Sequence, residues 1–182
     1  MDLTSTIFLV MFFIYIVTDR IAMHKAAVPR RKMKREWTAL LLTTPFFLVV
    51  VASLVEYFQL KSPPNLLELG IGSLLFAAAA IVRARGYLDL GEEASIYSAA
   101  GSKKMIRNGL YRHIRHPLYL GSLLFLIACP TFLGVRFAWT IAVIGLAGIL
   151  IRIQEEEKYL RRHVKDYREY MQETWTLIPG VF

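Results

Sequence analysis

The sequence is poor in the residues that form disulfides and metal sites. It contains one cysteine, Cys129, which excludes an intrachain disulfide. Cys129 lies inside an apolar run, and we interpret it as a core-packing residue. The four histidines are too few for a histidine-rich di-metal lipid oxidase. His113 and His116 stand three residues apart, but a catalytic zinc ion normally has three protein ligands, and we therefore predict no metal site.

The sequence also lacks internal repeats and low-complexity tracts, and its positive charges are not gathered into one basic face. The formal net charge is +8, with 22 Lys and Arg against 14 Asp and Glu, yet these charges fall between apolar runs. That distribution argues against a nucleic-acid partner and favours a membrane surface. Hydrophobic residues make up 55% of the chain, a composition too apolar for an ordinary soluble domain of this size.

Apolar runs long enough to cross a bilayer, about 20 residues each, occur five times. We expect the first to be an uncleaved helix, because no positive region precedes it and a basic segment follows it. The Pro63-Pro64 turn predicts that the second and third runs form an antiparallel hairpin. The fold class is therefore all-α, a polytopic membrane bundle of about five transmembrane helices plus a C-terminal cytosolic amphipathic helix. The expected spans are 3–22, 37–59, 66–82, 118–135 and 137–153.

The lysines and arginines predict the orientation of this bundle. Twenty of the 22 fall in the segments 20–36, 83–116 and 152–182. Because retained positive charge marks the cytoplasmic side of short loops, we expect the N-terminus outside and the C-terminus in the cytoplasm. The membrane would be the cell membrane in a prokaryote and the endoplasmic reticulum in a eukaryote. The third and fifth runs are short, so Arg83 and Arg152 are expected to snorkel.

Function is sought in the two large polar segments, since the loops on the other side are too short to build a site. We treat 1–182 as a single membrane domain, with the first three transmembrane helices in 1–82. The catalytic half is then 83–182, which holds a loop, two transmembrane helices and the C-terminal helix.

The first polar constellation is Gly109-Leu-Tyr-Arg-His-Ile-Arg-His-Pro-Leu-Tyr-Leu-Gly121. Pro117 suits the first turn of a helix, where its missing N–H costs nothing, and this places His116 at the start of that helix. Free backbone N–H groups at a helix N-terminus can bind an anion. By composition alone, the same segment also fits a basic, aromatic membrane anchor.

The second constellation is Arg152-Ile-Gln-Glu-Glu-Glu-Lys-Tyr-Leu160. At 100° per residue, Glu157 falls within one apolar stripe, Glu156 lies at its edge, and Glu155 points away. Arg152 and Glu156 could form a simple i, i+4 ion pair. Alternatively, Glu156 binds a polar or cationic group of a ligand, and Arg152 binds an anionic one. The stripe defines the buried face of a helix predicted to continue to about residue 174: Ile153, Leu160, Val164, Tyr167, Met171 and Trp175.

These two motifs, in this order, resemble the isoprenylcysteine carboxyl methyltransferase family. Its signatures are Gly-x-Tyr-x-x-x-Arg-His-Pro-x-Tyr-x-Gly and Glu-Glu-x-x-Leu followed by Tyr-x-x-Tyr and Ile-Pro. The phospholipid N-methyltransferases share the same cytosolic pattern. The resemblance covers residues 103–180, and the chain departs from it at Lys103 and at 163–165.

The resemblance implies a membrane methyltransferase that uses S-adenosyl-L-methionine without a soluble Rossmann fold. The implied catalytic residues are Arg152, which would hold the substrate, and Glu156. The implied acceptor is lipophilic, taken from the bilayer, with O-methylation of an isoprenylcysteine-like carboxylate as the expected reaction. The implied cofactor contacts are Lys103, Lys104, Met105, Ile106, Tyr111, His116, Pro117, Leu118, Tyr119 and Glu156.

Other functions stay open at this point. A phospholipid or another lipid could be the N- or O-methyl acceptor. A reductase related to the sterol reductases would use NADPH, although such chains are normally longer. A non-enzymatic membrane protein would use the polar segments only as anchors.

Overall fold

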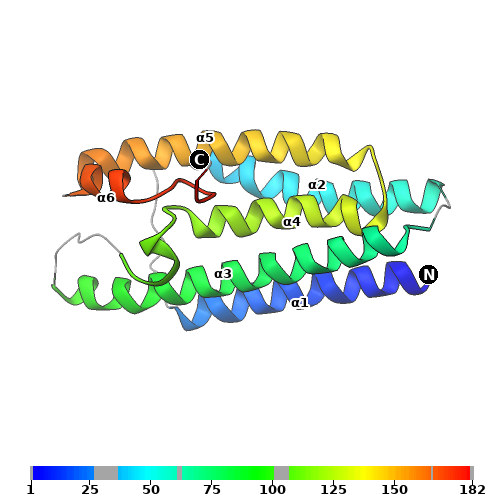
Figure 1. Ribbon diagram of the computed structural model, residues 1–182, viewed down its shortest axis with the longest axis horizontal. Helices are drawn as coiled ribbons and strands as arrows, with labels where there is room; N and C mark the ends of the chain where they lie inside the picture. The colour runs from blue at the N-terminus through cyan, green and yellow to red at the C-terminus, as the bar shows by residue number, and fades with distance from the viewer. Residues whose placement is uncertain (1, 27–36, 61–62, 101–106, 165, 181–182) are drawn as a thin grey trace.

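The computed structural model of the protein describes residues 2–26, 37–60, 63–100, 107–164 and 166–180. These residues form long helices that run side by side along the longest axis of the molecule (Figure 1). The predicted all-α class is confirmed. The elements are α1 (Leu3–Lys25), α2 (Trp37–Leu60), α3 (Leu66–Ala100), η1 (Gly109–Arg112, a 3-10 helix), α4 (Pro117–Leu133), α5 (Ala138–His163) and α6 (Tyr167–Glu173).

Four of these helices are long and apolar enough to cross a membrane, over Leu3–Lys25, Thr43–Leu60, Leu66–Gly91 and Ala138–His163. The predicted span 118–135 corresponds to α4, which is apolar but only 17 residues long. The two runs predicted to be short belong instead to the two longest helices, α3 and α5. Their polar residues after 82 and 153 simply continue the helix, because no proline interrupts either segment.

The outer surface of the bundle is apolar. Phe13, Phe47, Leu74 and Ile144 each expose more than 60% of their surface. Exposed side chains of this size on several helices are unfavourable in water and are solvated by hydrocarbon in a bilayer. They identify the lipid-facing surface of the bundle.

Helix α4 lies at the centre of the bundle, in contact with α1, α2, α3 and α5. Its Phe125 is 1% exposed, and its ring lies 4.4 Å from that of Tyr15, 5.1 Å from that of Phe46 and 5.6 Å from that of Phe76. One aromatic side chain thereby joins α4 to three other helices. Cys129 is fully buried on the same helix, as predicted.

The predicted pairing of the second and third spans needs correction. Helices α2 and α3 run antiparallel, but α2 packs against α5 and α4, whereas α3 packs against α4 and α1. The central α4 separates them, because its apolar surface is broad enough to be covered from both sides. A short connection sets the direction of the next helix, but it does not force the two helices into contact.

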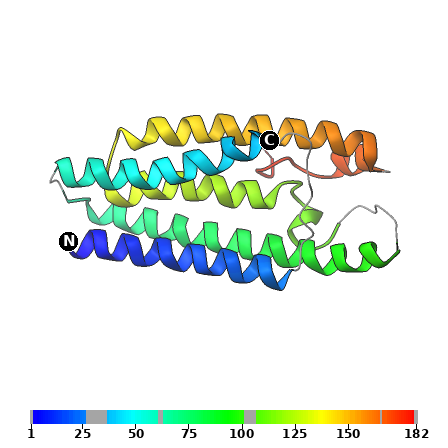
Figure 2. The ribbon, with the colours of Figure 1, turned by 180° about the vertical axis from the view of Figure 1, so that it is seen from behind.

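The two ends of the bundle differ in character. The N-terminus, the α2–α3 connection and the α4–α5 connection lie at one end, and η1, α6 and the far end of α3 lie at the other (Figures 1 and 2). We call the second end the polar end. It brings together the described parts of the two polar segments, as the charge distribution predicts.

At the opposite end, side chains cap the helices across the bundle. Glu56 of α2 accepts hydrogen bonds from the N–H groups of Arg136, Phe137 and Ala138, at 2.8, 2.8 and 3.0 Å. Ala138 is the first residue of α5, Phe137 is its N-cap and Arg136 precedes both, so these N–H groups have no partner within the helix. Glu56 therefore fixes the start of α5 against α2.

We expect Glu56→Ala to destabilise the bundle by about 1–3 kcal/mol, because three backbone donors lose a charged acceptor. Thermal unfolding of the purified protein in detergent measures the effect. Gln59→Ala, on the exposed surface of the same helix, is the control. An equal melting temperature for the two variants would show that Glu56 is not a structural cap.

Candidate functional site

The N-terminus of α4 is the centre of the candidate site. His116 is the N-cap residue and Pro117 occupies the first turn, as predicted. The His116 side chain makes no capping hydrogen bond to α4 and is 6% exposed. It is therefore directed into the protein rather than used to end the helix.

The turn before α4 is held by Asp89 of α3. This carboxylate is 1% exposed, accepts a 2.8 Å hydrogen bond from the N–H of Leu110 and lies 2.9 Å from Nε of Arg85. Gly109 adopts a positive φ of 52°, and a Cβ atom there would overlap the Asp89 carboxylate. Glycine is thus required at this position for two reasons, the backbone conformation and the close approach of Asp89.

Glu157 of α5 lies at the meeting point of two arginines and a histidine. Its Oε1 atom lies 2.8 Å from Nε of Arg115 and 3.4 Å from Nε2 of His116. Its Oε2 atom lies 3.5 Å from Nη2 of Arg161. The Glu157 and Arg115 side chains are only 9% and 8% exposed, so this is a buried ion pair. Its burial confirms the predicted position of Glu157 within the apolar stripe.

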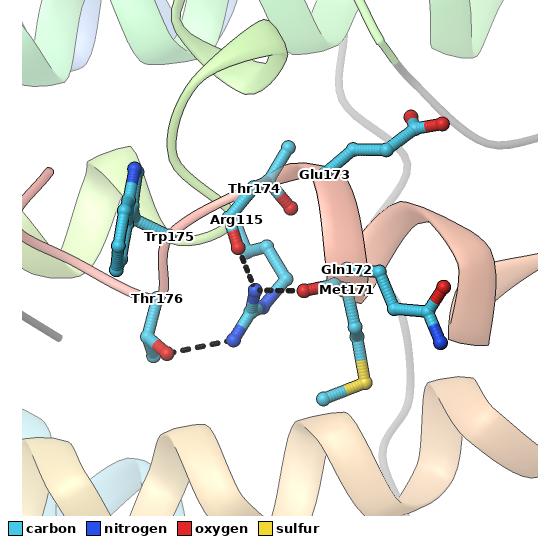
Figure 3. Close-up of a pocket in the computed structure, with 7 residues that line it drawn as sticks. All are labelled: Arg115, Met171, Gln172, Glu173, Thr174, Trp175 and Thr176. Atoms are coloured by element: carbon cyan, nitrogen blue, oxygen red, sulfur yellow. Dashed lines mark hydrogen bonds between the residues drawn. The ribbon is translucent and has the colours of Figure 1, made fainter. Parts of the chain in front are cut away.

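Arg115 also binds the segment 174–177, which we call the C-terminal strap. Its guanidinium donates to the carbonyl of Met171 at 3.1 Å, to the carbonyl of Thr174, and to Oγ1 of Thr176 at 2.7 Å (Figure 3). These contacts surround a cavity of about 390 Å³ that opens to solvent. Because Arg115 has partners on the strap and on Glu157, it joins the strap to α5.

Backbone hydrogen bonds hold the strap beside the start of α4. Arg115 N–H donates to the carbonyl of Trp175 at 2.8 Å, and His116 N–H donates to the carbonyl of Thr176 at 3.2 Å. Trp175 N–H donates to the carbonyl of His113 at 3.0 Å, which completes a short parallel bridge. The strap is therefore an integral wall of the site.

The prediction of one helix continuing to about residue 174 is wrong. Helix α5 ends at His163, Val164 is extended, and Asp166 adopts a φ of 63° before α6 begins. Tyr167 and Tyr170 are still buried, at 1% exposed each, but they lie on α6, which is a separate helix after the end of α5. Trp175, predicted to be buried on the apolar stripe, is 48% exposed because it lies on the strap.

A second group of side chains joins α4 to α5. The Tyr119 hydroxyl donates a 2.8 Å hydrogen bond to Oε2 of Glu156 and accepts one from Nε of Arg152 at 3.3 Å. All three residues are half-buried. Glu155 instead accepts a 3.0 Å hydrogen bond from Lys158 on the surface of the helix. The predicted difference between Glu156 and Glu155 is confirmed, and Arg152, expected to snorkel, contacts this group.

Two buried phenols line the same region. The Tyr111 ring is buried, and the backbone carbonyl of Tyr111 accepts a 2.6 Å hydrogen bond from the Tyr170 hydroxyl. Burial raises the pKa of Tyr111 well above its usual range, and the charge of Glu156 adds to this effect. Burial also raises the pKa of Tyr167, with a contribution from Glu157. Both phenols therefore stay protonated near neutral pH and do not act as proton acceptors there.

The expectation that Arg83 snorkels is wrong. Its side chain is 15% exposed and forms a 2.5 Å ion pair with Asp19 inside the bundle. Snorkelling fails because acceptors on α1 and α4 bind the guanidinium inside the bundle. A polar Asp in the first apolar run was the signal in the sequence for this pair.

Four of the predicted donor-binding residues lie outside the described residues: Lys103, Lys104, Met105 and Ile106. Within the described part of the chain, no group of three or more His, Cys, Asp and Glu side chains is arranged to hold a metal ion. His113 is exposed and His116 faces Glu157, so these two histidines do not form a shared site.

Comparison with known proteins shows that the chain is similar to methyltransferases. A family model described as phospholipid methyltransferase matches residues 67–166, more than half of the chain. The chain is 29% identical over 83 residues to the protein-S-isoprenylcysteine O-methyltransferase of Dictyostelium discoideum, covering 42% of this chain and 33% of that protein. The match therefore spans only about a third of that relative's length.

A second relative is matched over more of its length. The chain is 26% identical over 181 residues to the methanethiol S-methyltransferase of Mycobacterium tuberculosis, covering 87% of this chain and 73% of that protein. No solved structure matches the chain.

Arg115→Met is expected to release the C-terminal strap, because the strap loses two side-chain hydrogen bonds, α6 loses the one at Met171, and Glu157 loses its nearest cation. Hydrogen exchange measured by mass spectrometry on the peptide containing Trp175 should become at least tenfold faster. Breaking a buried pair from one side costs about 3–5 kcal/mol, which is enough for this change. Arg112→Met, at an exposed arginine of η1, is the matched control. Unchanged exchange in Arg115→Met would show that the strap is held without Arg115.

Proposed function

Because the chain belongs to the phospholipid methyltransferase family, we propose that it is a membrane methyltransferase that uses S-adenosylmethionine and a lipophilic acceptor. The observation that carries the proposal is the contact of Tyr119 with both Glu156 and Arg152 beside the start of α4. It places a carboxylate and a guanidinium, which bind groups of opposite charge, on adjacent turns of one helix. The two named methyltransferase relatives support the same reaction class.

The described residues fit the donor. S-adenosylmethionine supplies, when bound, a methyl group on a positively charged sulfur atom, and it carries an amino-acid tail with two charged ends. The N-terminus of α4, which has no side-chain cap, favours a carboxylate through the positive end of its helix dipole. Glu156 is half-buried and favours an ammonium group or hydroxyls. Each charged end of the donor tail thus has a partner of the opposite charge in the protein.

We assign donor binding to the segment 103–106 and to residues around the start of α4 and on α5. Tyr111 is buried against Tyr170 and excludes water from this region. The contribution of 103–106 rests on the sequence resemblance alone. The assigned residues are Lys103, Lys104, Met105, Ile106, Tyr111, His116, Pro117, Leu118, Tyr119 and Glu156.

Arg152 is assigned to the acceptor. Its Nε atom contacts the Tyr119 hydroxyl, which holds the guanidinium close to Glu156 without burying it completely. A carboxylate acceptor is ionised near pH 7 and needs no proton acceptor, so alignment by Arg152 in a dry site is sufficient. An isoprenylcysteine-like carboxylate is the acceptor that this arrangement favours.

A thiol is the second candidate acceptor, because the methanethiol S-methyltransferase match extends over most of this chain. A thiol must lose a proton before or during methyl transfer. The contact of His116 with Glu157 provides the group that takes this proton: the imidazole accepts it and the carboxylate stabilises the resulting charge. The phenols of Tyr111 and Tyr167 cannot substitute, since their pKa values are raised.

The charge distribution supports an orientation with the polar end in the cytoplasm, where S-adenosylmethionine is available. A lipid-borne acceptor then approaches from the bilayer and the donor approaches from the aqueous side. The start of α4 separates the two approaches.

We expect Glu156→Ala to abolish binding of the product analogue S-adenosylhomocysteine, measured by calorimetry on purified protein. Glu155→Ala, one residue away and paired with Lys158 instead of Tyr119, should bind as the wild type does. Equal losses in both variants would contradict the assignment of Glu156. Absence of binding to the wild-type protein up to millimolar concentration would contradict the donor itself.

Acceptor class is tested with methyl-labelled S-adenosylmethionine and three molecules that share one prenyl chain: a cysteine thioether with a free carboxylate, its carboxamide, and the prenyl thiol. We expect a base-labile labelled ester from the carboxylate and no label in the amide. The rate with the carboxylate should be independent of pH between about 6 and 8, because that group is ionised throughout.

A labelled thioether from the thiol, formed faster as pH rises, would favour the second acceptor. No labelled product from either acceptor, in protein that binds S-adenosylhomocysteine, would contradict both acceptor classes. Transfer of tritium from labelled NADPH to a membrane lipid would instead support a reductase.

A further inference from the structure

Arg83 makes polar contacts with three helices inside the bundle. Its Nε atom lies 2.5 Å from Oδ1 of Asp19 on α1. Its Nη1 atom donates to Oγ of Ser122 at 2.6 Å and to the carbonyl of Leu118 at 3.3 Å, both on α4. Its Nη2 atom donates to the Tyr87 hydroxyl at 2.9 Å. One guanidinium therefore connects α1, α3 and α4.

Stability alone does not explain why Arg83 and its polar partners are buried together. Arg83 and Asp19 are 15% and 14% exposed in a bundle with an apolar interior, and charged groups lose hydration there. Replacement of a buried ion pair by apolar side chains is often neutral or stabilising. Ionised residues within membrane helices are rare and tend to mark functional positions. The contacts on α4 indicate what this position could do.

Arg83 acts on the first turns of α4, which carry the candidate site. Leu118 directly precedes Tyr119 in the chain, so the carbonyl bound by Arg83 belongs to the peptide unit that leads into Tyr119. Tyr119 extends toward α5, whereas Leu118 and Ser122 contact α3. The start of α4 is thus held between Arg83 on one side and Glu156 with Arg152 on the other.

Gly121 makes this approach feasible. A Cβ atom at residue 121 would overlap Cγ of Arg83, so a larger residue would push the arginine away from α4. The last glycine of the first sequence motif therefore serves the arginine of a different helix. That link is not visible in the motif itself.

We propose that Arg83 is a positioning residue that fixes the first turn of α4, and through it Tyr119, for donor binding. The inference rests on the proposed function, because it assumes that Tyr119 and Glu156 bind the donor. The forked shape of the guanidinium is the essential property, since it reaches Asp19, Leu118, Ser122 and Tyr87 together. A lysine ammonium keeps the charge but cannot satisfy all these partners in one plane.

Calorimetry with S-adenosylhomocysteine separates positioning from folding. The fitted stoichiometry reports the fraction of protein that is folded, and Kd reports the geometry of the site in that fraction. For Arg83→Lys we expect a stoichiometry near that of the wild type and a Kd at least tenfold weaker. Arg20→Lys, at an exposed arginine next to Asp19, should leave both values unchanged.

A wild-type Kd in Arg83→Lys, or a lower stoichiometry with an unchanged Kd, would overturn the positioning role. If Arg83→Lys does not fold, Ser122→Ala decides the question, because it removes only one Nη1 partner on α4. A weaker Kd in Ser122→Ala supports the role and an unchanged Kd overturns it. Failure of the wild-type protein to bind would overturn the proposed function instead, so the two failures are distinguishable.

Discussion

The carboxylate of Glu157 is withdrawn from solvent at the polar end, and the surrounding structure must compensate its charge. A buried carboxylate without partners is strongly unfavourable, so the side chains that contact it are structural requirements. Arg115 and His116 come from the turn before α4, and Arg161 comes from the next turn of α5. By holding Arg115, Glu157 also determines where the C-terminal strap can lie. The charge of Glu157 therefore sets the relative positions of α4, α5 and the C-terminal strap.

The general form of the fold follows from the sequence because a bilayer allows few solutions. Apolar runs must be helical when backbone groups have no water to bind, and the positions of lysine and arginine separate the two ends. Which helices pack against each other could not be predicted in the same way. The proline pair 63–64 correctly places a turn between α2 and α3, yet α4 lies between these helices. Which helix occupies the centre depends on side-chain shapes such as that of Phe125, and hydropathy does not report shape.

The candidate site was predictable where helical geometry applies and unpredictable where the chain folds back. The 100° rotation per residue separates Glu156 and Glu157 from Glu155 correctly. It fails beyond His163, because Val164 is extended and the helical periodicity ends there. Asp89 and Arg83 were missed for a different reason. Their partners, Leu110 and Asp19, are distant in sequence, and only the tertiary structure brings them together.

The length of α4 has a consequence for how the protein fits its bilayer. Seventeen residues at 1.5 Å per residue extend over about 25 Å, whereas the hydrocarbon layer is about 30 Å thick. Both ends of α4 cannot reach the two headgroup layers of an undeformed bilayer. Either the first turn of α4, with Tyr119, or the other end of the helix is therefore recessed toward the acyl chains, unless the lipids thin around it. In either case the thickness of the membrane affects how deep the first turn of α4 lies. The lipid composition of the membrane is therefore part of the chemical environment of the site.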